Sequence, residues 1–591
     1  MNENNANFTP EAPNFKTLVR MSFQGLTNFP YIEEDFDALA NYGLLSKVVE
    51  YLNQVISNNN EQNDLMTGLY NAYVSLQDYV NNYFDVTFPE QINNKLDEMA
   101  SDGTLENLLN DAAHLTKSYN TYEQMISDSE HFTNGLRIKT FGYYNINDGG
   151  GAEYYVTNTS NESYYQIELQ NGLYLTLLNK DVINVKQLGV KGDGISDDTL
   201  LLQNVLDNFN NILIPKGTYL LSSLLITRDN INLSGENKTN TILKNINVSG
   251  NAFNFIGISN CNNVNISNVT INGDKKGANT PIAFVNVNNC ELHDSIVTGG
   301  NSQRTINVQS FIANTGDNIK IYNNDVTTYG NIASGALIEC TGERGEDTEL
   351  HYLTNIEIIN NKCIVSSGTY VGDSDLFDCI EIDNTKNCLI DKNYCNSILH
   401  KGISVDTRNI DFRVTNNYCT NMTIHGIEST GSLGETKGII SNNTIESVGT
   451  GIAINNEDIL VIGNSIVNST TRGIITLENA KNCVISSNYI NGAGDGIYIA
   501  AQSTLISVIG NKTLNITNTN AGVVVPVGTG PGIEVYSTEN STSLTLSRIK
   551  GYNGVIVDRV PAQNNTIFIQ GTRLRYKDSN GAIYTIDKTA D

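Results

Sequence analysis

Residues 464–498 read NSIVNSTTRGIITLENAKNCVISSNYINGAGDGIY, and the same short pattern occurs twice within this stretch. Each copy starts with Asn-x-apolar, at Asn464 and Asn488, and continues to Gly-Ile, at Gly473 and Gly496. Cys483-Val-Ile485 places apolar residues on alternate positions just before the second Asn. The pattern extends toward the N-terminus. Its first element also stands at Asn361, Asn393, Asn417 and Asn443, and its second at Gly402, Gly426 and Gly451.

The two elements share one period of about two dozen residues, which indicates a repeat architecture. Each unit holds three short alternating strands joined by Asn or Gly turns, too little to bury a core alone, so successive units must stack. The pattern predicts a parallel β-helix with Ile, Val and Cys pointing inward in aligned columns. We expect Asn at the turns to adopt left-handed backbone and to bond to the Asn above and below. Leucine-rich repeats have a similar period, but LxxLxLxxN is absent.

The segments around the repeat predict different structures. Apolar residues between 45 and 83 alternate steps of three and four, which is a heptad seam with a polar layer at Asn59 and Gln62. We expect an oligomeric coiled coil there, with a helical hairpin turning at 58–64 as the alternative. Two short helices follow at 88–112, broken at Asp102-Gly103. The strands predicted for a small β module are 136–144, 153–157, 164–169 and 173–178.

After residue 515 the period fades, and strands near 523–527, 543–547, 566–570 and 582–586 are expected to cap the open end of the solenoid. The predicted domains are therefore an N-terminal segment with a helical stalk at 1–112, a β-rich linking module at 113–182, the β-helix at 183–515, and a C-terminal β cap or trimerisation region at 516–591. The fold class is mainly β.

Composition limits the function. Lys and Arg total 36 against 63 Asp and Glu, a net charge of −27, which repels nucleic acid and anionic membranes. The sequence has no stretch of about 20 apolar residues and begins without a secretory pattern, so we expect synthesis in a cytoplasm and no membrane insertion. The nine Cys fall between 261 and 483 on apolar positions, which predicts buried reduced thiols. Scattered His and the lack of CxxC give transition-metal binding little support.

Residues 183–199 (INVKQLGVKGDGISDDT) and 212–219 (ILIPKGTY) resemble the first coil of the pectate-lyase-like right-handed β-helix superfamily. There Asp197 or Asp198 would cap a helix whose apolar side chains cover the solenoid end. The side chains expected to do so are Leu200, Leu201, Val205 and Leu206.

Residues 141–155 and 28–84 resemble modules of tail spike or neck appendage proteins of phages that infect Gram-positive bacteria. This likeness implies a homotrimer that is located in the virion and synthesised in the host cytoplasm. It also implies an N-terminal region attached to phage tail or neck proteins and a β-helix facing the host.

Carboxylates gather on one predicted face. Alignment of 379–383 with 402–406 and 426–430 leaves alternate residues pointing outward, and it places Glu339 in the column of Asp383 and Asp406. Stacked like charges are costly and raise the pKa of at least one group, as a general acid requires. The candidate catalytic residues are Glu339, Asp378, Glu381, Asp383, Asp406 and Glu428.

Two long insertions, 342–351 and 366–375, border the same face and are typical of a binding groove. The candidate substrate-binding residues are Tyr352, Tyr370, Lys401, His425 and Arg408. The aromatic rings would stack on sugars.

The predicted function is binding and depolymerisation of a host polysaccharide or teichoic acid by glycoside hydrolysis, without a cofactor. One alternative is an adhesin that binds the same polymer uncut. Another is a calcium-dependent lyase that uses Glu339, Asp383 and Asp406 as ligands and Lys401 or Arg408 as base. In a third, these carboxylates are plain solvated surface.

Overall fold

The computed structural model describes part of the chain. The described residues are 117–160, 166–178, 181–247, 253–274, 279–299, 304–328, 335–343, 349–365, 377–398, 400–431, 436–517, 522–524, 534–536, 566–570, 573–577 and 582–585. The predicted heptad seam, the two short helices and the strand near 543–547 lie outside them. The chain divides into two compact units, Met1–Asn179 and Lys180–Asp591.

The first unit contains a five-stranded sheet in the order β1-β2-β3-β5-β4. Its pairs are antiparallel except β1 with β2, and the buried side chains include Ile138, Val156 and Leu175. A short helix, which the sequence pattern did not predict, precedes β2. The elements are β1 Lys117–Tyr119, α7 Tyr122–Ser127, η1 Ser129–His131, β2 Arg137–Thr140, β3 Glu153–Thr157, β4 Gln166–Glu168 and β5 Tyr174–Leu177.

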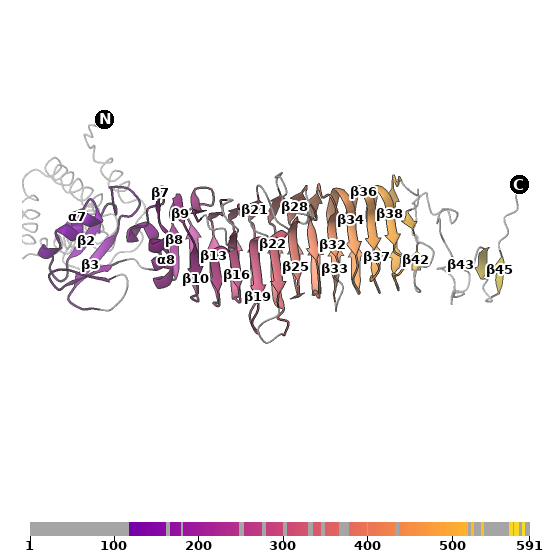
Figure 1. Ribbon diagram of the computed structural model, residues 1–591, viewed down its shortest axis with the longest axis horizontal. Coiled ribbons are helices and arrows are strands. Elements are labelled where there is room, and N and C mark those ends of the chain that lie inside the picture. The colour runs from indigo at the N-terminus through magenta and orange to yellow at the C-terminus, as the bar shows by residue number, and fades with distance from the viewer. Residues whose placement is uncertain are drawn as a thin grey trace, which may run out of the picture. The chain divides into compact units, whose positions relative to one another are not determined.

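The second unit is a parallel β-helix, as predicted, and its coils follow one another along one axis from β8 to β38 (Figure 1). One side of each coil belongs to a 15-stranded sheet, here called face A. Its strands are β6 Ile183–Asn184, β8 Asn211–Ile214, β11 Ile231–Gly235, β14 Val264–Ser267, β17 Asn288–His293, β20 Asp317–Tyr322, β23 Leu353–Ile359, β26 Thr385–Lys386, β27 Leu389–Asp391, β30 Ile410–Thr415, β33 Lys437–Ser441, β35 Ile459–Ile462, β37 Val484–Ser486, β39 Ser507–Ile509 and β42 Glu534–Tyr536.

The other two sides form one 22-stranded sheet. The side that follows face A in the chain is face B. It comprises β7 Asp193–Asp197, β9 Gly217–Leu221, β12 Thr241–Asn245, β15 Thr270–Asn272, β18 Ile296–Thr298, β21 Asp325–Thr328, β24 Lys362–Val365, β28 Tyr394–Ser397, β31 Tyr418–Thr420 and β40 Lys512–Leu514.

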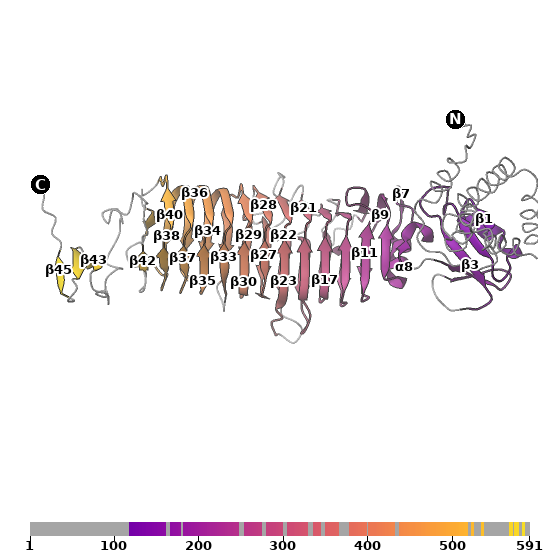
Figure 2. The same ribbon diagram turned by 180° about the vertical axis from the view of Figure 1, so that it is seen from behind.

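Face C completes the coil and comprises β10 Leu224–Ile226, β13 Phe253–Ser259, β16 Asn279–Val285, β19 Arg304–Ser310, β22 Gly335–Gly342, β25 Phe377–Asp383, β29 Ile403–Val405, β32 His425–Ser429 and β41 Val523–Val524. Three long strands, β34 Thr444–Ile454, β36 Ser465–Thr476 and β38 Tyr489–Ile499, run from face B into face C. Figure 2 shows the same stack from behind.

A ladder of buried asparagines runs through the solenoid, which confirms the predicted Asn-to-Asn bonding. In each step the backbone N–H and the side-chain Nδ2 of one Asn donate to Oδ1 of the Asn on the next coil, as Asn393 does to Asn417 at 2.9 and 3.0 Å. The left-handed backbone, however, belongs to the residue before the ladder Asn, for example Asn416 with φ 56°. The ladder Asn therefore makes the bonds between coils, and the residue before it adopts the left-handed backbone, although the sequence analysis assigned both roles to one Asn. The ladder residues are Asn324, Asn361, Asn393, Asn417, Asn443, Asn464, Asn488 and Asn511.

The Gly-Ile element marks the corner between faces B and C, where successive coils come very close. A Cβ atom built on Gly451 would lie 2.4 Å from the carbonyl oxygen of Gly473, and one on Gly473 would lie 2.6 Å from that of Gly496. Only glycine leaves room for this approach. The repeat of Gly is therefore a steric requirement of the corner.

Gly451→Ala is expected to lower the free energy of unfolding by about 2 kcal/mol, because the new methyl group meets backbone that cannot move aside. The matched control is Gly257→Ala, whose Cβ would lie 3.2 Å from the flexible Leu225 Cδ1. Thermal unfolding followed by circular dichroism compares them. Equal melting temperatures for the two variants would contradict this explanation of the repeat.

All nine cysteines are free and buried, as predicted. Cys363, Cys395 and Cys419 occupy the same inward position on successive coils. Burial raises the pKa of the Cys388 thiol to about 12, so it stays protonated. Among the described residues the thiols therefore serve as small apolar core side chains.

Helix α8, Thr199–Asn208, begins after Asp198 as expected, but its buried face differs from the prediction. Leu202, Val205 and Leu206 are buried, whereas Leu200 is 72% exposed. The Asp198 carboxylate accepts the N–H groups of Lys191 and Gly192 and does not bond to the helix itself. The prediction of Leu200 as a covering residue is wrong because the helix face is rotated relative to the expected one.

Pairing continues past residue 515, where the sequence period fades. Strand β41 pairs with β38 and β42 pairs with β39, so both sheets extend beyond that point. Further along, β43 Thr566–Gln570, β44 Arg573–Lys577 and β45 Ile583–Thr585 form an antiparallel three-stranded sheet. Within the described residues, we find no helix with the length and apolar character needed to span a bilayer.

Candidate functional site

The predicted carboxylates lie on face C, along four successive strands from β22 to β32. Ile380 pairs with Ile403, which in turn pairs with Ile427, as the sequence alignment predicted. Because side chains alternate along a strand, Glu381 and Glu428 point outward in one column with a serine between them. That serine is Ser404.

Glu339 lies in a different column from the predicted one. It pairs with Glu381, whereas Thr341 pairs with Asp383. The predicted register of β22 was two residues out, and a two-residue shift keeps a side chain on the same face. Glu339 is therefore the neighbour of Glu381 on the same face.

Three of the six carboxylates are covered rather than solvated, which contradicts the plain-surface alternative for these three, whereas Glu381, Asp383 and Asp406 are half-buried. Glu339 and Asp378 are each 5% exposed and Glu428 is 7% exposed. Buried carboxylates are costly unless they are paired or protonated. Each one therefore needs a partner or a proton.

Glu381 holds a proton. Its pKa is raised to about 9 by burial, by the neighbouring carboxylates of Glu339, Asp406 and Asp378, and by a hydrogen bond with Asp406. At neutral pH its carboxyl group is a donor poised on the outer side of the sheet. This is the protonation state that a general acid requires.

Asp383 follows Glu381 by two residues on β25 and shares its face. Burial and then the carboxylate of Asp406 raise its pKa to about 7, against hydrogen bonds from backbone N–H groups. Its Oδ1 is buried and has no hydrogen-bond partner among the described residues. Asp406 is held by the hydroxyl groups of Ser404 at 2.8 Å and Thr430 at 3.2 Å.

Lys401 and His425 meet at Glu428, so these two predicted residues do join the cluster. The ammonium group of Lys401 lies 3.0 Å from Glu428 Oε2, and His425 Nδ1 lies 2.5 Å from the same oxygen. Burial opposes the charge on Glu428, but the hydrogen bond from His425 and the charge of Lys401 lower its pKa to about 2. Glu428 is thus a fixed anion.

Two cationic or titratable residues of the cluster were not predicted. Arg304 on β19 bonds to Glu339 at 2.5 Å, and His400 Nδ1 lies 2.6 Å from Asp378 Oδ1. Arg304 was missed because the predicted face began at Gly335 and did not include β19. His400 stands directly before Lys401, and its position beside Asp378 could have been found from the alignment that placed Lys401 there.

Two predicted binding residues, Arg408 and Tyr352, do not join the cluster. Arg408 has a left-handed backbone, φ 53°, in the turn that leads from face C to β30 on face A. Tyr352 precedes β23, and the ammonium of Lys386 lies 3.9 Å from its ring centroid. Tyr370 lies outside the described residues.

The calcium arrangement predicted for Glu339, Asp383 and Asp406 is not present, because Glu339 is not in their column. Within the described part of the chain, no group of three or more His, Cys, Asp and Glu side chains has a geometry that could hold a metal ion. Arg304 supplies the positive charge beside Glu339 instead.

Two family models match the chain. Residues 182–257 match the family described as rhamnogalacturonase A/epimerase, pectate lyase-like, and residues 378–549 match the right-handed β-helix region family. The first match contains the residues whose likeness to that superfamily was noted from sequence. The second contains most of the carboxylate cluster.

Among curated proteins, plasmin and fibronectin-binding protein A of Streptococcus pneumoniae is 30% identical over 108 residues. That segment covers 17% of this chain and 15% of the relative. Two solved structures are each 15% identical in sequence to this chain, and each match spans 61% of this chain. The A-module of mannuronan C-5 epimerase AlgE4 from Azotobacter vinelandii is covered in full with a TM-score of 0.45, and the N-terminal fragment of bacteriophage Phi29 gene product 12 is covered to 71% with a TM-score of 0.43. Phage tailspike proteins are also among the structural neighbours.

Proposed function

We propose that this chain is a phage receptor-binding spike that binds a host cell-surface polysaccharide or teichoic acid and cleaves it by glycoside hydrolysis on face C. The observation that carries the proposal is the crowding of Glu339, Glu381, Asp383 and Asp406 on one outward face, which raises the pKa of Glu381 to about 9. The family match to a right-handed β-helix and the phage proteins among the structural neighbours agree with it.

Glu381 is the proposed general acid and Asp383 the proposed general base. Residues two apart on a strand lie about 6.6 Å apart, which is within the roughly 6.5–9.5 Å that an inverting glycosidase needs to fit a water between its carboxyl groups. The carboxylate of Asp383, a half-buried side chain, would take the proton of that water. The carboxylate of Asp406 raises the pKa values of both Glu381 and Asp383.

The remaining features of the proposal rest on the sequence. The heptad seam at 45–83 supports a homotrimer, and the likeness of 28–84 and 141–155 to phage modules supports attachment of the N-terminal region to tail or neck proteins. The chain would then be synthesised in the host cytoplasm and reside in the virion, with 516–591 as the C-terminal cap or trimerisation region.

The direct test incubates the purified chain with capsule and wall polymers from a panel of Gram-positive bacteria. New reducing ends without ultraviolet absorbance from unsaturated uronate support hydrolysis, and Asp383→Asn and Asp406→Asn should abolish their release. The matched control is Asp411→Asn, whose carboxylate is 71% exposed on face A. Unsaturated product would indicate a lyase, binding without release an adhesin, and neither binding nor release would overturn the proposal.

The rate of cleavage is expected to be bell-shaped in pH. It should rise as Asp383 loses its proton around pH 7 and fall as Glu381 loses its proton around pH 9. Measuring kcat/KM from about pH 5 to about pH 10 follows both the rise and the fall of the rate. A profile that stays flat through pH 9 would exclude Glu381 as the acid.

A further inference from the structure

A hollow lies at the first coils of the solenoid, where helix α8 contacts strand β10 (Figure 1). Its volume is about 730 Å³, within the range of about 300–1,000 Å³ that small-molecule sites have. The helix lines it with Leu200, Gln203 and Asp207, which follow one another at steps of three and four residues and so share one helix face. The segment 222–227, which contains β10, forms the opposite wall.

Gln203 fixes the helix against the strand. Its Oε1 accepts from the N–H of Leu225 at 2.9 Å, and its Nε2 donates to the carbonyl oxygen of Leu225 at 2.8 Å. Nε2 also donates to Asp207 Oδ1 at 2.8 Å. Near the start of the helix, Thr199 Oγ1 accepts from the N–H of Ser222 at 2.8 Å. Both walls are therefore held in place before a ligand arrives, which lowers the cost of binding.

Two leucines present apolar surface inside the hollow. Leu200 is 72% exposed and Leu225 is 52% exposed, one on each wall. A single exposed leucine is ordinary on a protein surface. Two of them in one hollow that also holds polar side chains are typical of a binding site.

The polar side chains of the hollow keep hydrogen-bonding capacity. Among the described residues, Asp207 accepts from Gln203 through Oδ1, and Asp197 accepts from Thr199 through Oδ1. The second oxygen of each of these exposed carboxylates has no partner in that part of the chain, and neither has the exposed hydroxyl group of Ser223. The hollow therefore offers accessible acceptors around an apolar floor.

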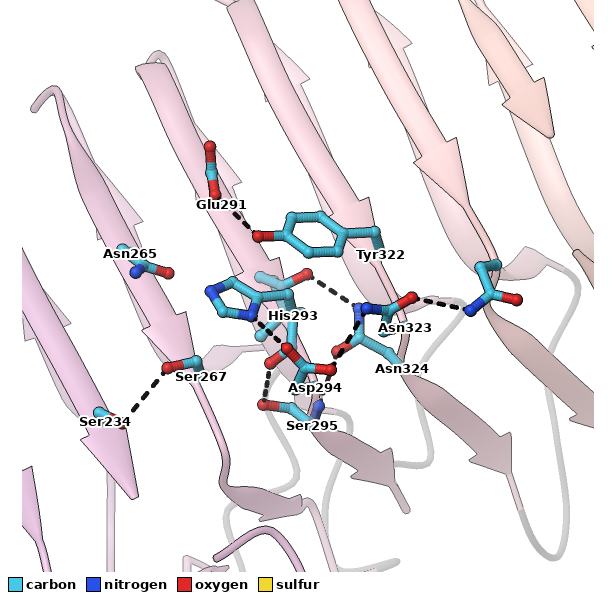
Figure 3. Close-up of polar contacts among 12 residues, drawn as sticks. Ser234, Asn265, Ser267, Glu291, His293, Asp294, Ser295, Tyr322, Asn323 and Asn324 are labelled. Atoms are coloured by element: carbon cyan, nitrogen blue, oxygen red, sulfur yellow. Dashed lines mark hydrogen bonds and ion pairs between the residues drawn. The ribbon is translucent and has the colours of Figure 1, made fainter. Parts of the chain in front are cut away.

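Polar side chains on face A behave differently. There Ser267 Oγ donates to Ser234 Oγ at 3.4 Å, and the Tyr322 hydroxyl donates to Glu291 Oε2 at 3.1 Å, in each case across one step between coils (Figure 3). Such ladders direct polar groups at one another. The accessible acceptors of the hollow are thus a local feature of the first coils.

The hollow is separate from the carboxylate cluster, although both lie in one outward column of face C. Leu225 and Glu381 are five coils apart in that column, about 24 Å along the axis. The residues between them are Gly257, Ala283, Asn307 and Glu339. A small ligand in the hollow therefore does not touch Glu381.

We propose that this hollow binds a short neutral glycan. Sugar hydroxyl groups donate to the second oxygens of Asp197 and Asp207, and the C–H groups of the sugar rings pack on Leu200 and Leu225. None of the described residues that line the hollow is Lys or Arg, so an acidic glycan would meet two carboxylates without a compensating cation. This site does not depend on the cleavage proposed for the carboxylate cluster.

The test titrates the full chain with maltotriose, cellotriose, mannotriose and triacetylchitotriose, followed by saturation-transfer NMR, with trigalacturonate as the acidic comparison. At least one neutral trisaccharide should bind, and trigalacturonate should bind about tenfold more weakly or not at all.

Asp207→Ala and Leu225→Ala should each weaken binding of that trisaccharide about tenfold, because the first removes a charge-assisted hydrogen bond and the second an apolar contact. The matched controls are Asp411→Ala, a carboxylate 71% exposed on face A, and Leu505→Ala, a leucine 50% exposed in a later coil. Both should bind as the parent does.

The proposal is wrong if no neutral trisaccharide binds, if trigalacturonate binds equally well, or if Asp207→Ala or Leu225→Ala keeps the parent affinity. It is also wrong if the control variants lose as much affinity. All four substitutions replace exposed side chains, and circular dichroism checks that each variant is folded. Glu381→Gln must leave this binding unchanged, which separates failure of the hollow from failure of the cleavage site.

Discussion

Glu381→Gln is expected to abolish polysaccharide cleavage and, at the same time, to make the folded chain more resistant to heat at neutral pH. Glutamine keeps the shape and hydrogen-bonding capacity of the protonated side chain but has no proton to give. Loss of a general acid lowers kcat by about 10²–10⁴-fold. The measurement is release of reducing ends under substrate-saturating conditions.

The gain in stability follows from the raised pKa of Glu381. Between its ordinary value of 4.5 and about 9, the unfolded chain releases this proton while the folded chain keeps it. Stability is therefore greatest below pH 4.5 for this group and is lost as pH rises toward 9. Gln does not titrate, so Glu381→Gln should gain on the order of 2 kcal/mol at neutral pH.

The control for Glu381→Gln is Glu357→Gln on face A, a side chain 40% exposed and 3.7 Å from Lys320. It should change neither cleavage nor melting temperature appreciably. If Glu381→Gln remained active, or if it melted lower than the parent at neutral pH, the assignment of a protonated Glu381 would be wrong.

Asn417→Ala is expected to cause the largest loss of stability among single substitutions in the solenoid. The side chain of Asn417 accepts from the N–H and Nδ2 of Asn393 and donates to the carbonyl of Ile390 and to Asn443. Alanine removes all four of these hydrogen bonds and leaves the buried N–H of Asn393 without its acceptor, whereas Asn393 Nδ2 keeps its bond to the carbonyl of Ile358. At about 1 kcal/mol for each hydrogen bond, the loss is on the order of 4 kcal/mol.

Asn416→Gly is the matched control, because Asn416 is the adjacent residue and has a left-handed backbone that glycine adopts freely. Its side chain bonds to Asp391 near the surface and not within the ladder. Urea or thermal unfolding should separate the two variants widely. Similar midpoints would contradict the ladder as a main source of coil-to-coil stability.

The β-helix and most of its inward columns could be predicted from the sequence because the local structure requires Asn and Gly at their positions in the repeat. Buried Asn must bond along the axis, and a Cβ on Gly451 would lie 2.4 Å from a carbonyl oxygen, so both residues recur along the later coils. The Gly-Ile element is missing from β22 and β25, so their register could not be fixed, and Glu339 was placed two residues out.

The residues that gather at the candidate site were predicted better than their positions relative to one another. All six carboxylates, Lys401 and His425 lie on face C, because alternation along a strand survives a two-residue error. Their burial and the partners Arg304 and His400 could not be read from the pattern, since these depend on how neighbouring side chains cover the sheet. Residues in turns, such as Arg408, were the least predictable.

The most direct test of the central claim is a structure of Glu381→Gln bound to an oligosaccharide of the polymer that the unmodified chain cleaves. The glycan should lie on face C with its glycosidic oxygen at residue 381 and a water at the carboxylate of Asp383. A glycan bound across another face, with the carboxylates of β25 uncontacted, would contradict it.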